Sequence, residues 1–245
     1  YREYKPNPKL EQIIECYWSA KADQPPFRER ESLIPDGTIE LMFNFGDNYS
    51  QITKGSRKSV KGSHIIGIRK HSLFISQTKQ QDFFSIRFKL GGTYPFFKIP
   101  THLFANAFYG LDVLPDKEYK EIEQRLQEAE SDEKRVTIAE RYLLRRLNKN
   151  ISDYAFVNAC LTRLLQRSPL KVHDLVNEFN TTYKTIERKF KDVTGLTPME
   201  LLKIKRFNKA IHSMYSCEYD SLSAVAGDCG YYDQSHFIRE FKQLT

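Results

Sequence analysis

Hydrophobic and polar residues alternate along the first 110 residues of the chain, and short turn-forming segments interrupt the alternation. The clearest stretch, residues 38–45 (TIELMFNF), lies between the turn-type sequences PDG and GDN, and residues 64–68, 72–76 and 82–90 follow the same pattern. Because successive side chains of a strand point to opposite faces, this pattern predicts strands. Several strands without long helices between them predict an antiparallel sandwich or barrel.

Beyond residue 110, apolar residues recur at the three- and four-residue spacing of helices. A first helix is expected to begin at Asp116, with Tyr119, Ile122 and Leu126 on one face. Further helices are expected at residues 132–148, 153–167, 171–179, 182–193, 198–215, 221–228 and 233–244. The sequence therefore predicts an α+β chain with a β-rich domain (1–112), a helical pair (113–150) and an all-α domain (151–245).

The all-α region contains an internal repeat. Each unit has a short apolar helix, a tight turn and a second helix that opens on a residue able to cap it. Asn180 and Gly230 stand where the turn needs a left-handed residue, so each unit has the pattern of a helix-turn-helix. The pairs that match at an offset of 51 residues are Thr182/Asp233, Ile186/Phe237, Arg188/Arg239, Phe190/Phe241 and Lys191/Lys242.

The second helix of each unit has a polar face, because its apolar residues, four apart, must point to the core. Arginine suits guanine edges or phosphates, and Gln, Ser and His can contact base edges. A lone pattern of this kind also fits an ordinary helical hairpin or a protein-interaction module, and Arg188 or Arg239 could be a structural ion-pair donor. Two copies in register favour DNA binding. The candidate DNA-binding residues are Tyr183, Lys184, Glu187, Arg188, Lys191, Gln234, Ser235, His236 and Arg239.

A predicted helix of 18 residues, 198–215, connects the two units. At the standard rise it is roughly 27 Å long. Its apolar residues can pack on both units, so that the two polar helices enter successive major grooves, which recur about every 34 Å. These apolar residues are Leu201, Leu202, Ile204, Ala210 and Ile211.

Two segments of the repeat, KTIERKFKDVTGLTP and GYYDQSHFIREFK, resemble the signature of the AraC/XylS family of bacterial transcription regulators. The resemblance covers residues 151–245 and implies sequence-specific binding to double-stranded promoter DNA, with RNA polymerase as a further partner. Asn180 stands where the family usually has glycine and Val176 where it usually has alanine. The resemblance also implies a closing helix, and the sequence stops at Thr245 before it.

The first half resembles, less closely, the β-rich, cupin-like domain that precedes the DNA-binding region in a subset of these regulators. The resemblance rests on IPDG with Glu40-Leu41 and on IRFKLGG. It implies a sensor of an unidentified small-molecule effector and assigns no binding residue. The helical pair at 113–150 is a candidate homodimer contact, or a scaffold that braces both domains.

The first half contains no sequence motif typical of an enzyme. His64, His71 and His102 are too sparse for a metal-binding pattern, and no cofactor loop is present. Asp36, Glu40 and Asp47 are expected in turns or on a solvated strand face. We expect no enzyme activity, metal or cofactor, although a cupin-type enzyme domain fused to a DNA-binding module is the alternative. Core packing is favoured over a ligand pocket for the aromatic residues Phe83, Phe84, Tyr94, Phe96, Phe97, Phe104, Phe108 and Tyr109.

The positive net charge of the chain is typical of a protein with a polyanionic partner, but it does not show where the partner binds. The chain of 245 residues carries a net charge of +7, of which +5 falls in residues 1–150 and +2 in the remainder. With 40% hydrophobic residues, the chain can build packed cores. No long apolar run or signal peptide is evident, so a cytoplasmic location is expected, without a membrane partner. Free thiols are expected at the scattered cysteines Cys16, Cys160, Cys217 and Cys229.

Overall fold

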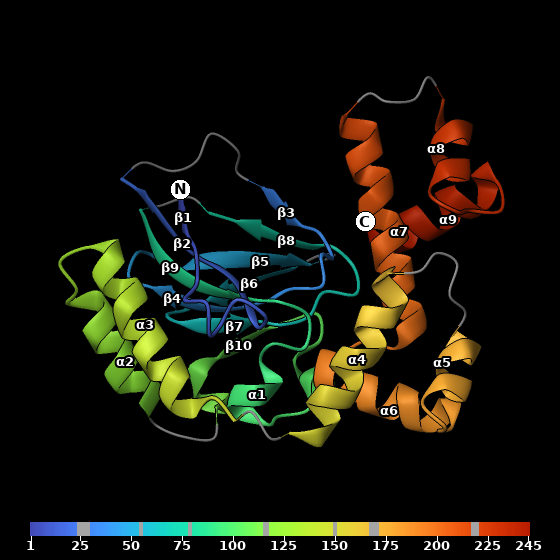
Figure 1. Cartoon of the computed structure of the whole chain (residues 1–245). Coiled ribbons are helices and arrows are strands. Elements are labelled where there is room, and N and C mark those ends of the chain that lie inside the picture. The colour runs from blue at the N-terminus through green and yellow to red at the C-terminus, as the bar shows by residue number, and fades with distance from the viewer. Residues whose placement is uncertain are drawn as a thin grey trace.

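The computed structural model describes residues 1–23, 30–53, 56–77, 80–114, 118–148, 151–166, 172–216 and 221–245. A β-rich half is followed by a helical half, and the two lie against each other (Figure 1). Asp116, where the first helix is predicted to begin, and Cys217 lie outside the described residues. No helix in the part that the structure describes is long and apolar enough to cross a membrane.

The larger sheet has six antiparallel strands in the order β1-β2-β9-β4-β7-β10. Its central pairings join Glu40 to Arg87 and Met42 to Ser85, between β4 and β9. The predicted strands 38–45, 64–68 and 82–90 are found here as β4, β7 and β9. The strands are β1 (Arg2–Tyr4), β2 (Ile14–Ala22), β4 (Ile39–Asn44), β7 (His64–Ile66), β9 (Gln81–Phe88) and β10 (Phe108–Gly110).

The smaller sheet has four antiparallel strands in the order β3-β8-β5-β6. It faces the larger sheet, and Tyr49 and Ile75 from it pack with Trp18, Met42 and Phe83 from the larger one. The prediction of an antiparallel sandwich is therefore confirmed. The strands are β3 (Glu31–Leu33), β5 (Tyr49–Thr53), β6 (Ser56–Val60) and β8 (Leu73–Ser76).

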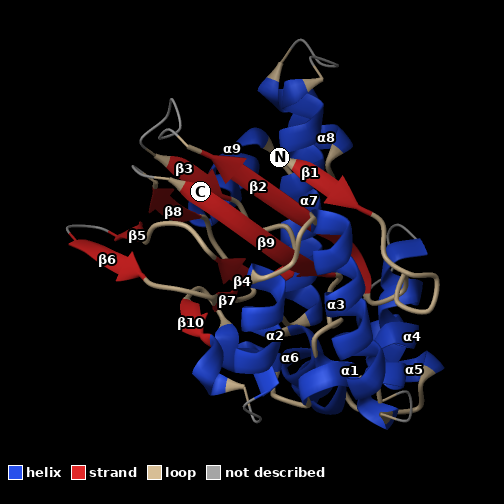
Figure 2. Cartoon of the chain, turned by 90° about the vertical axis from the view of Figure 1, so that its left-hand side faces the viewer, coloured by secondary structure: helices blue, strands red, loops and turns tan. Residues whose placement is uncertain are grey.

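The opposite face of the larger sheet is covered by helices (Figure 2). Ile122 and Leu143 pack in one core with Phe84 and Ile86 of β9. The carboxylate of Asp132 also accepts a hydrogen bond from Ser19 Oγ at 2.7 Å, which ties the helical pair to β2. The pair thus braces the sheet, and its use as a dimer contact stays a prediction. The helices are α1 (Tyr94–Phe97), α2 (Glu118–Gln127) and α3 (Asp132–Arg146).

Six helices in the described residues form the second half, and each lies within a few residues of its predicted position. The hydroxyl of Thr197 accepts a hydrogen bond from Glu200 N, and the Glu200 carboxylate accepts one from Thr197 N, so this capping box fixes where the connector begins. The helices are α4 (Ser152–Gln166), α5 (Val172–Glu178), α6 (Tyr183–Thr194), α7 (Pro198–Tyr215), α8 (Leu222–Asp228) and α9 (Gln234–Leu244).

The two halves share one hydrophobic core and several polar contacts. Thr101 Oγ1, in the short helix η1 (Thr101–Phe104), donates to Val193 O near the end of α6 at 2.8 Å. Ser72 donates from both N and Oγ to Leu244 O at the end of α9, at 2.8 and 2.9 Å. The β-rich half therefore contacts the C-terminal ends of both predicted DNA-reading helices.

The structure separates the aromatic residues of the first half into two environments. Phe83 faces the smaller sheet, whereas Phe84, Phe96 and Phe104 belong to the core that continues into the helical half. His64 is buried, and burial lowers its pKa to about 4. Its Nε2 lies 2.6 Å from the hydroxyl of Tyr49, so it belongs to a neutral polar contact within the sandwich. Cys16, Cys160 and Cys229 are free and buried.

One expectation for the first half is wrong. Glu40 is not on a solvated strand face, because its side chain is only 7% exposed. Both faces of the larger sheet are covered, so a residue that points toward the smaller sheet has no access to bulk water. Asp36 does serve a turn, since its Oδ1 accepts hydrogen bonds from Thr38 N and Oγ1 at 2.9 and 2.8 Å.

Candidate nucleic-acid interface

The first helix-turn-helix unit consists of α5, a turn and α6. Asn180 has φ of 43°, the left-handed conformation that the sequence predicts for the turn. The hydroxyl of Thr182 accepts a hydrogen bond from Thr185 N at 3.2 Å and so caps α6. Ile186 and Phe190 are fully buried, which turns the opposite face of α6 outward. Gly195, at φ of 78°, ends the helix.

The second unit repeats this construction with α8 and α9. Gly230 has φ of 77°, and Asp233 accepts a hydrogen bond from His236 N at 2.6 Å. Phe237 is buried and Phe241 is partly buried, as their match to Ile186 and Phe190 predicts. Local sequence thus sets the same geometry twice, once in each unit.

Helix α7 holds the two units together. In Figure 1, α6 lies near the lower end of α7, while α8 and α9 lie beside its upper part. Leu201, Ile204 and Phe207 belong to the core that includes Ile186 and Phe190 of the first unit. Ala210 packs instead with Val225, Ala226 and Phe237 of the second unit. One helix therefore contributes to both cores, which fixes the two polar helices relative to each other.

The outward face of α6 is polar, and each of its paired charges has an acidic partner one turn away. The Arg188 side chain is 62% exposed, and its Nη1 lies 3.7 Å from Asp192 Oδ2. Lys191 Nζ lies 3.0 Å from Glu187 Oε1, and this hydrogen bond raises the pKa of Lys191. Exposed pairs of this kind contribute little to stability, so a phosphate or a base can replace the acidic partner. Tyr183 and Lys184 are also exposed.

The outward face of α9 differs in its charges. Gln234, Ser235 and Arg239 are exposed, and no ion pair of Arg239 is found among the described residues. Gln234 Oε1 accepts a hydrogen bond from Ser223 Oγ at 2.9 Å, which orients its side chain beside α8. His236 is less exposed, and its Nε2 lies 3.8 Å from Glu240 Oε2. Every predicted residue of both sets therefore lies at or near the outer surface of its helix.

A buried ion pair between α7 and α9 was not predicted from the sequence. Glu240 is only 5% exposed, and both of its oxygens accept hydrogen bonds from Arg206 Nη2, at 2.9 and 3.0 Å. Lys203 Nζ lies 3.9 Å away from the same carboxylate. The one available signal was position, since Glu240 follows Phe237 by three residues and so lies on the inward side of α9. This contact orients the second polar helix.

We expect Glu240→Ala to lower the free energy of unfolding by about 1–3 kcal/mol, because the guanidinium of Arg206 loses its buried acceptor. Arg206 remains partly hydrated, with a side chain that is 29% exposed, so the loss should stay below that of a fully buried pair. The midpoint of urea unfolding measures the effect. Glu187→Ala is the matched control, because its pair with Lys191 is on the surface and its removal should change the midpoint little. Equal midpoints for the two variants would contradict the prediction.

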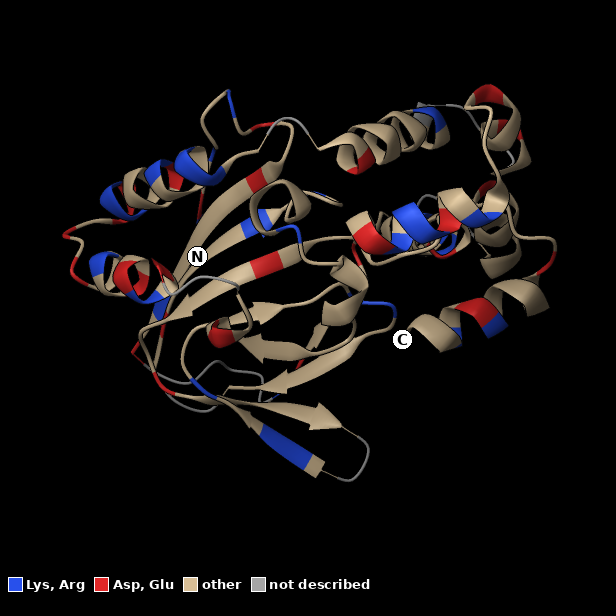
Figure 3. Ribbon diagram, turned by 90° about the horizontal axis from the view of Figure 1, so that it is seen from below, with Lys and Arg blue, Asp and Glu red and all other residues tan. Residues whose placement is uncertain are grey.

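Lysine and arginine alternate with acidic residues along the helices that the structure describes. Figure 3 shows acidic and basic segments interspersed along the helices of both halves. Bulk charge therefore does not locate a DNA-binding surface, as the even distribution along the sequence suggested. The surface is defined by the two capped helices and by the particular side chains that point outward from them.

The geometry defines a class of protein, a β-sandwich joined to a double helix-turn-helix domain. Residues 175–245 match the family described as "Helix-turn-helix domain", and residues 2–109 match a domain of unknown function, DUF6597. The helix-turn-helix match falls on the helical half of the chain, where the contacts described above form two such units.

Curated relatives match 69 residues of the chain. Over 69 residues the chain is 30% identical to the HTH-type transcriptional activator RhaS of Pectobacterium atrosepticum, which covers 28% of this chain and 24% of that protein. The RhaS of Escherichia fergusonii is 33% identical over 69 residues, which again cover 28% of this chain and 24% of that protein. The chain thus matches about a quarter of the length of these relatives.

Solved structures of ToxT from Vibrio cholerae can be overlaid on most of the chain. One covers 94% of each chain at 11% sequence identity with a TM-score of 0.45. Another, of ToxT with bound unsaturated fatty acid, covers 94% of this chain and 91% of that one, at 9% identity and a TM-score of 0.42. These overlays are loose, and the fold above is defined by the contacts of this chain itself.

Proposed function

We propose that the chain is a sequence-specific DNA-binding regulator of transcription that inserts α6 and α9 into successive major grooves of a promoter. The observation that supports this most strongly is the doubled unit, in which two capped helices expose Arg188 and Arg239 at the same step after a buried residue. A helical hairpin that only braced the fold would have no reason to repeat its outward arginine. Helix α7 packs on both units and would hold the two helices in one orientation for reading.

The regulatory part of the proposal concerns the rest of the chain. The curated relatives are named as transcriptional activators, and that activity is proposed here for a chain that matches about a quarter of their length. Residues 151–245 would bind DNA, residues 1–112 would sense a small-molecule effector, and residues 113–150 would brace the sandwich and provide a homodimer contact. RNA polymerase would be the further partner at the promoter, in the cytoplasm of a bacterium. An effector can act only by binding one arrangement of the two halves better than another.

The first experiment is selection of bound duplexes from a random DNA library at near-physiological salt. Two enriched blocks about 10 base pairs apart, centre to centre, are expected, because two linked helices on one side of DNA contact sites one helical turn apart. A folded protein that enriches no sequence, alone or with cell extract added as a source of effector, would contradict the proposal. That result would favour a protein-interaction module.

Lys191→Ala is expected to weaken binding to all duplexes alike, because a lysine at this place on α6 would contact phosphate rather than a base edge. The slope of log affinity against log salt concentration should fall by about 1, since one fewer counterion is released. Titration of the selected duplex and of a scrambled duplex at several salt concentrations measures both effects. Lys58→Ala, on the exposed strand β6, is the control and should leave the slope unchanged. A loss confined to the selected duplex would make Lys191 a base-reading residue.

A further inference from the structure

A cavity of about 400 Å³ lies between the two sheets of the sandwich. Its size is within the usual range for small-molecule sites. The register of the larger sheet places its inward residues in rows, with Glu40 beside Arg87 and Met42 beside Ser85. Trp18, Met42, Tyr49 and Phe83 give it apolar and aromatic walls. The cavity therefore has the walls of a binding site, with apolar and aromatic side chains and polar groups at fixed positions.

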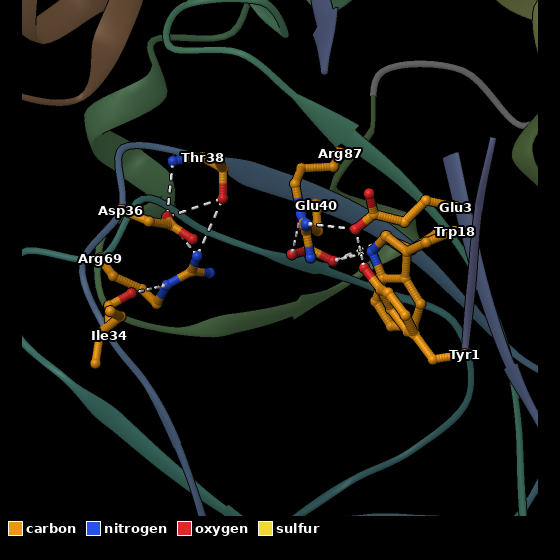
Figure 4. A network of polar contacts seen from close by, with 10 residues as sticks. Tyr1, Glu3, Trp18, Ile34, Asp36, Thr38, Glu40, Arg69 and Arg87 are labelled. Atoms are coloured by element: carbon orange, nitrogen blue, oxygen red, sulfur yellow. Dashed lines mark hydrogen bonds and ion pairs between the residues drawn. The ribbon is translucent and has the colours of Figure 1, made fainter. Parts of the chain in front are cut away.

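Two polar networks line the cavity, and both are shown in Figure 4. In the first, the carboxylate of Glu40 accepts hydrogen bonds from Trp18 Nε1 at 2.9 Å, Ser85 Oγ at 3.0 Å and Arg87 Nε at 3.1 Å. This carboxylate is close to saturated, so its role is to hold the tryptophan and the guanidinium in place.

The second network is centred on Arg69. Its side chain is only 4% exposed, Nε donates to Ile34 O at 2.9 Å, and Nη2 donates to Asp36 Oδ1 at 2.5 Å and Thr38 Oγ1 at 3.1 Å. Nη1 has no hydrogen-bond partner among the described residues. A donor on a nearly buried side chain can hydrogen-bond only to an acceptor that enters the space beside it. Arg69 lines the cavity, so an acceptor can reach it from there.

A second unpartnered donor lies at the start of β9. Gln81 Nε2 is buried without a hydrogen bond, and Gln81 also lines the cavity. Gln81 is the first residue of β9. Arg69 bonds to Thr38, which directly precedes the residue that pairs with Phe88 at the other end of β9. The two unpartnered donors therefore lie toward different ends of the cavity. The cavity thus offers donors at its ends and aromatic and apolar surface between them.

Each arginine that lines the cavity is paired with a carboxylate. Arg69 is paired with Asp36, and Arg87 is paired with Glu40, which leaves neither guanidinium to neutralise an added anion. Glu31 is a further acidic residue in the lining, and burial together with the charge of Glu40 raises its pKa. An additional negative charge would thus be disfavoured here, whereas an uncharged acceptor oxygen would meet free donors.

The segment that carries Arg69 also contacts the helical half. Residues 67–72 connect β7 to β8, and within them Lys70 Nζ lies 2.9 Å from Glu200 Oε1 in the capping box of α7. Ser72 donates to Leu244 O at the end of α9. Ile68 is fully buried and lies next to Gly195, which ends α6. Each of these contacts lies within three residues of Arg69 along the chain. A movement of Arg69 would therefore be passed to both helix-turn-helix units.

We propose that the cavity binds a small uncharged molecule with an aromatic or apolar body and a carbonyl-type oxygen that accepts a hydrogen bond from Arg69, and that residues 67–72 transmit its binding to both helix-turn-helix units. The second part of this inference rests on the proposed DNA-binding function. Arg69 is a ligand-binding and positioning residue in this scheme, while Lys70 and Ser72 carry the effect onward.

Four probes with one skeleton test the ligand class: 3-phenylpropanamide, 3-phenylpropanoate, 3-phenylpropylammonium and propylbenzene. The chain has one tryptophan, Trp18, which lies in the cavity wall, so its fluorescence reports occupancy directly. The uncharged amide is expected to bind at least about tenfold more tightly than either ion. The carboxylate adds a negative charge to a lining that already holds Glu31, Asp36 and Glu40, and the ammonium, like propylbenzene, has no acceptor for the donors of Arg69. Equal or tighter binding of an ion, or no fluorescence change with any probe, would overturn the proposed class.

Three variants locate the site. Arg69→Lys keeps the charge beside Asp36 but loses the fork of donors, and it should weaken binding of the amide about threefold to tenfold. Ala20→Phe adds a ring to the cavity wall and should abolish binding while the protein stays folded, as circular dichroism would verify. Lys58→Ala, on the exposed face of β6, should bind like the parent. Parent-like binding by Ala20→Phe would show that the probes bind elsewhere.

The effect of ligand binding on the helix-turn-helix units is measured first without DNA and then with DNA. Hydrogen exchange of residues 67–76 and of the end of α9 should change when the amide saturates the parent, and not when it saturates Arg69→Lys. The affinity for the selected duplex should change by about fivefold or more in the parent alone. Failure to bind any DNA would refute the proposed function yet leave the fluorescence and exchange results standing. Normal DNA binding with no exchange change on saturation would refute the coupling.

Discussion

Arg188→Ala and Arg239→Ala are each expected to weaken binding to the selected duplex by about 1–3 kcal/mol, and each should erase a different block of the sequence preference. Both side chains are exposed on the outward faces of α6 and α9. An arginine that makes a bidentate contact to guanine loses both hydrogen bonds when it is truncated, and no neighbouring side chain can replace the fork.

The two losses should add, because the arginines lie on different helices, in separate helix-turn-helix units. The double variant is therefore expected to lose about 2–6 kcal/mol, which approaches the difference between specific and non-specific binding. Competition with a scrambled duplex distinguishes base reading from phosphate contact. A loss that is equal on both duplexes would show that the arginine contacts the backbone only.

The helical pair of the first half supplies a matched control. Arg125 on α2 has the same kind of surface pair as Arg188, with its Nη1 3.6 Å from Glu121 Oε1, but it lies outside both helix-turn-helix units. Arg125→Ala removes the same charge as Arg188→Ala, also from an exposed ion pair on a helix surface. It should reduce affinity only through the small change in net charge, and it should leave both blocks intact.

The helices of the second half could be predicted closely, because their limits are set by neighbouring residues. Thr182, Thr197 and Asp233 each cap a helix through a hydrogen bond to a backbone N–H three residues later, and such caps are legible in sequence. The outward faces of α6 and α9 follow from the same spacing. Most of the candidate interface was thus available without the structure.

Strand β2 and the contacts between the halves were not predictable in this way. Cys16, Tyr17, Trp18 and Ser19 are buried in succession, so β2 lacks the alternation by which other strands were recognised. Its two buried faces result from the second sheet and the helices, which are distant in sequence. The contact of Ser72 with Leu244 joins residues 172 positions apart, and the pair of Glu240 with Arg206 joins two different helices. No local pattern records such pairings.

Gly67→Ala is expected to lower the free energy of unfolding by about 3 kcal/mol or more, through steric overlap with backbone. A Cβ at residue 67 would lie 1.4 Å from Phe104 O and 2.6 Å from Phe104 C. The neighbouring chain cannot withdraw easily, because Gly67 N donates to Ala107 O at 3.1 Å and Asn106 N donates to Ile68 O at 2.9 Å. These bonds hold residues 67–68 against residues 104–107.

The consequence should extend beyond the sandwich, because Phe104 ends the short helix whose Thr101 bonds to the end of α6. Urea unfolding of Gly67→Ala measures the loss of stability. Gly227→Ala is the matched control, since Gly227 is a helical residue of α8 with nothing within 4 Å of an added Cβ. That variant should be stabilised by about 0.5–1 kcal/mol, as alanine favours a helix over glycine. If both variants unfold at the parent's urea concentration, residues 67 and 104 do not approach this closely. If only Gly67→Ala is destabilised, the close backbone contact between residues 67 and 104 is required to dock the sandwich on the helical half.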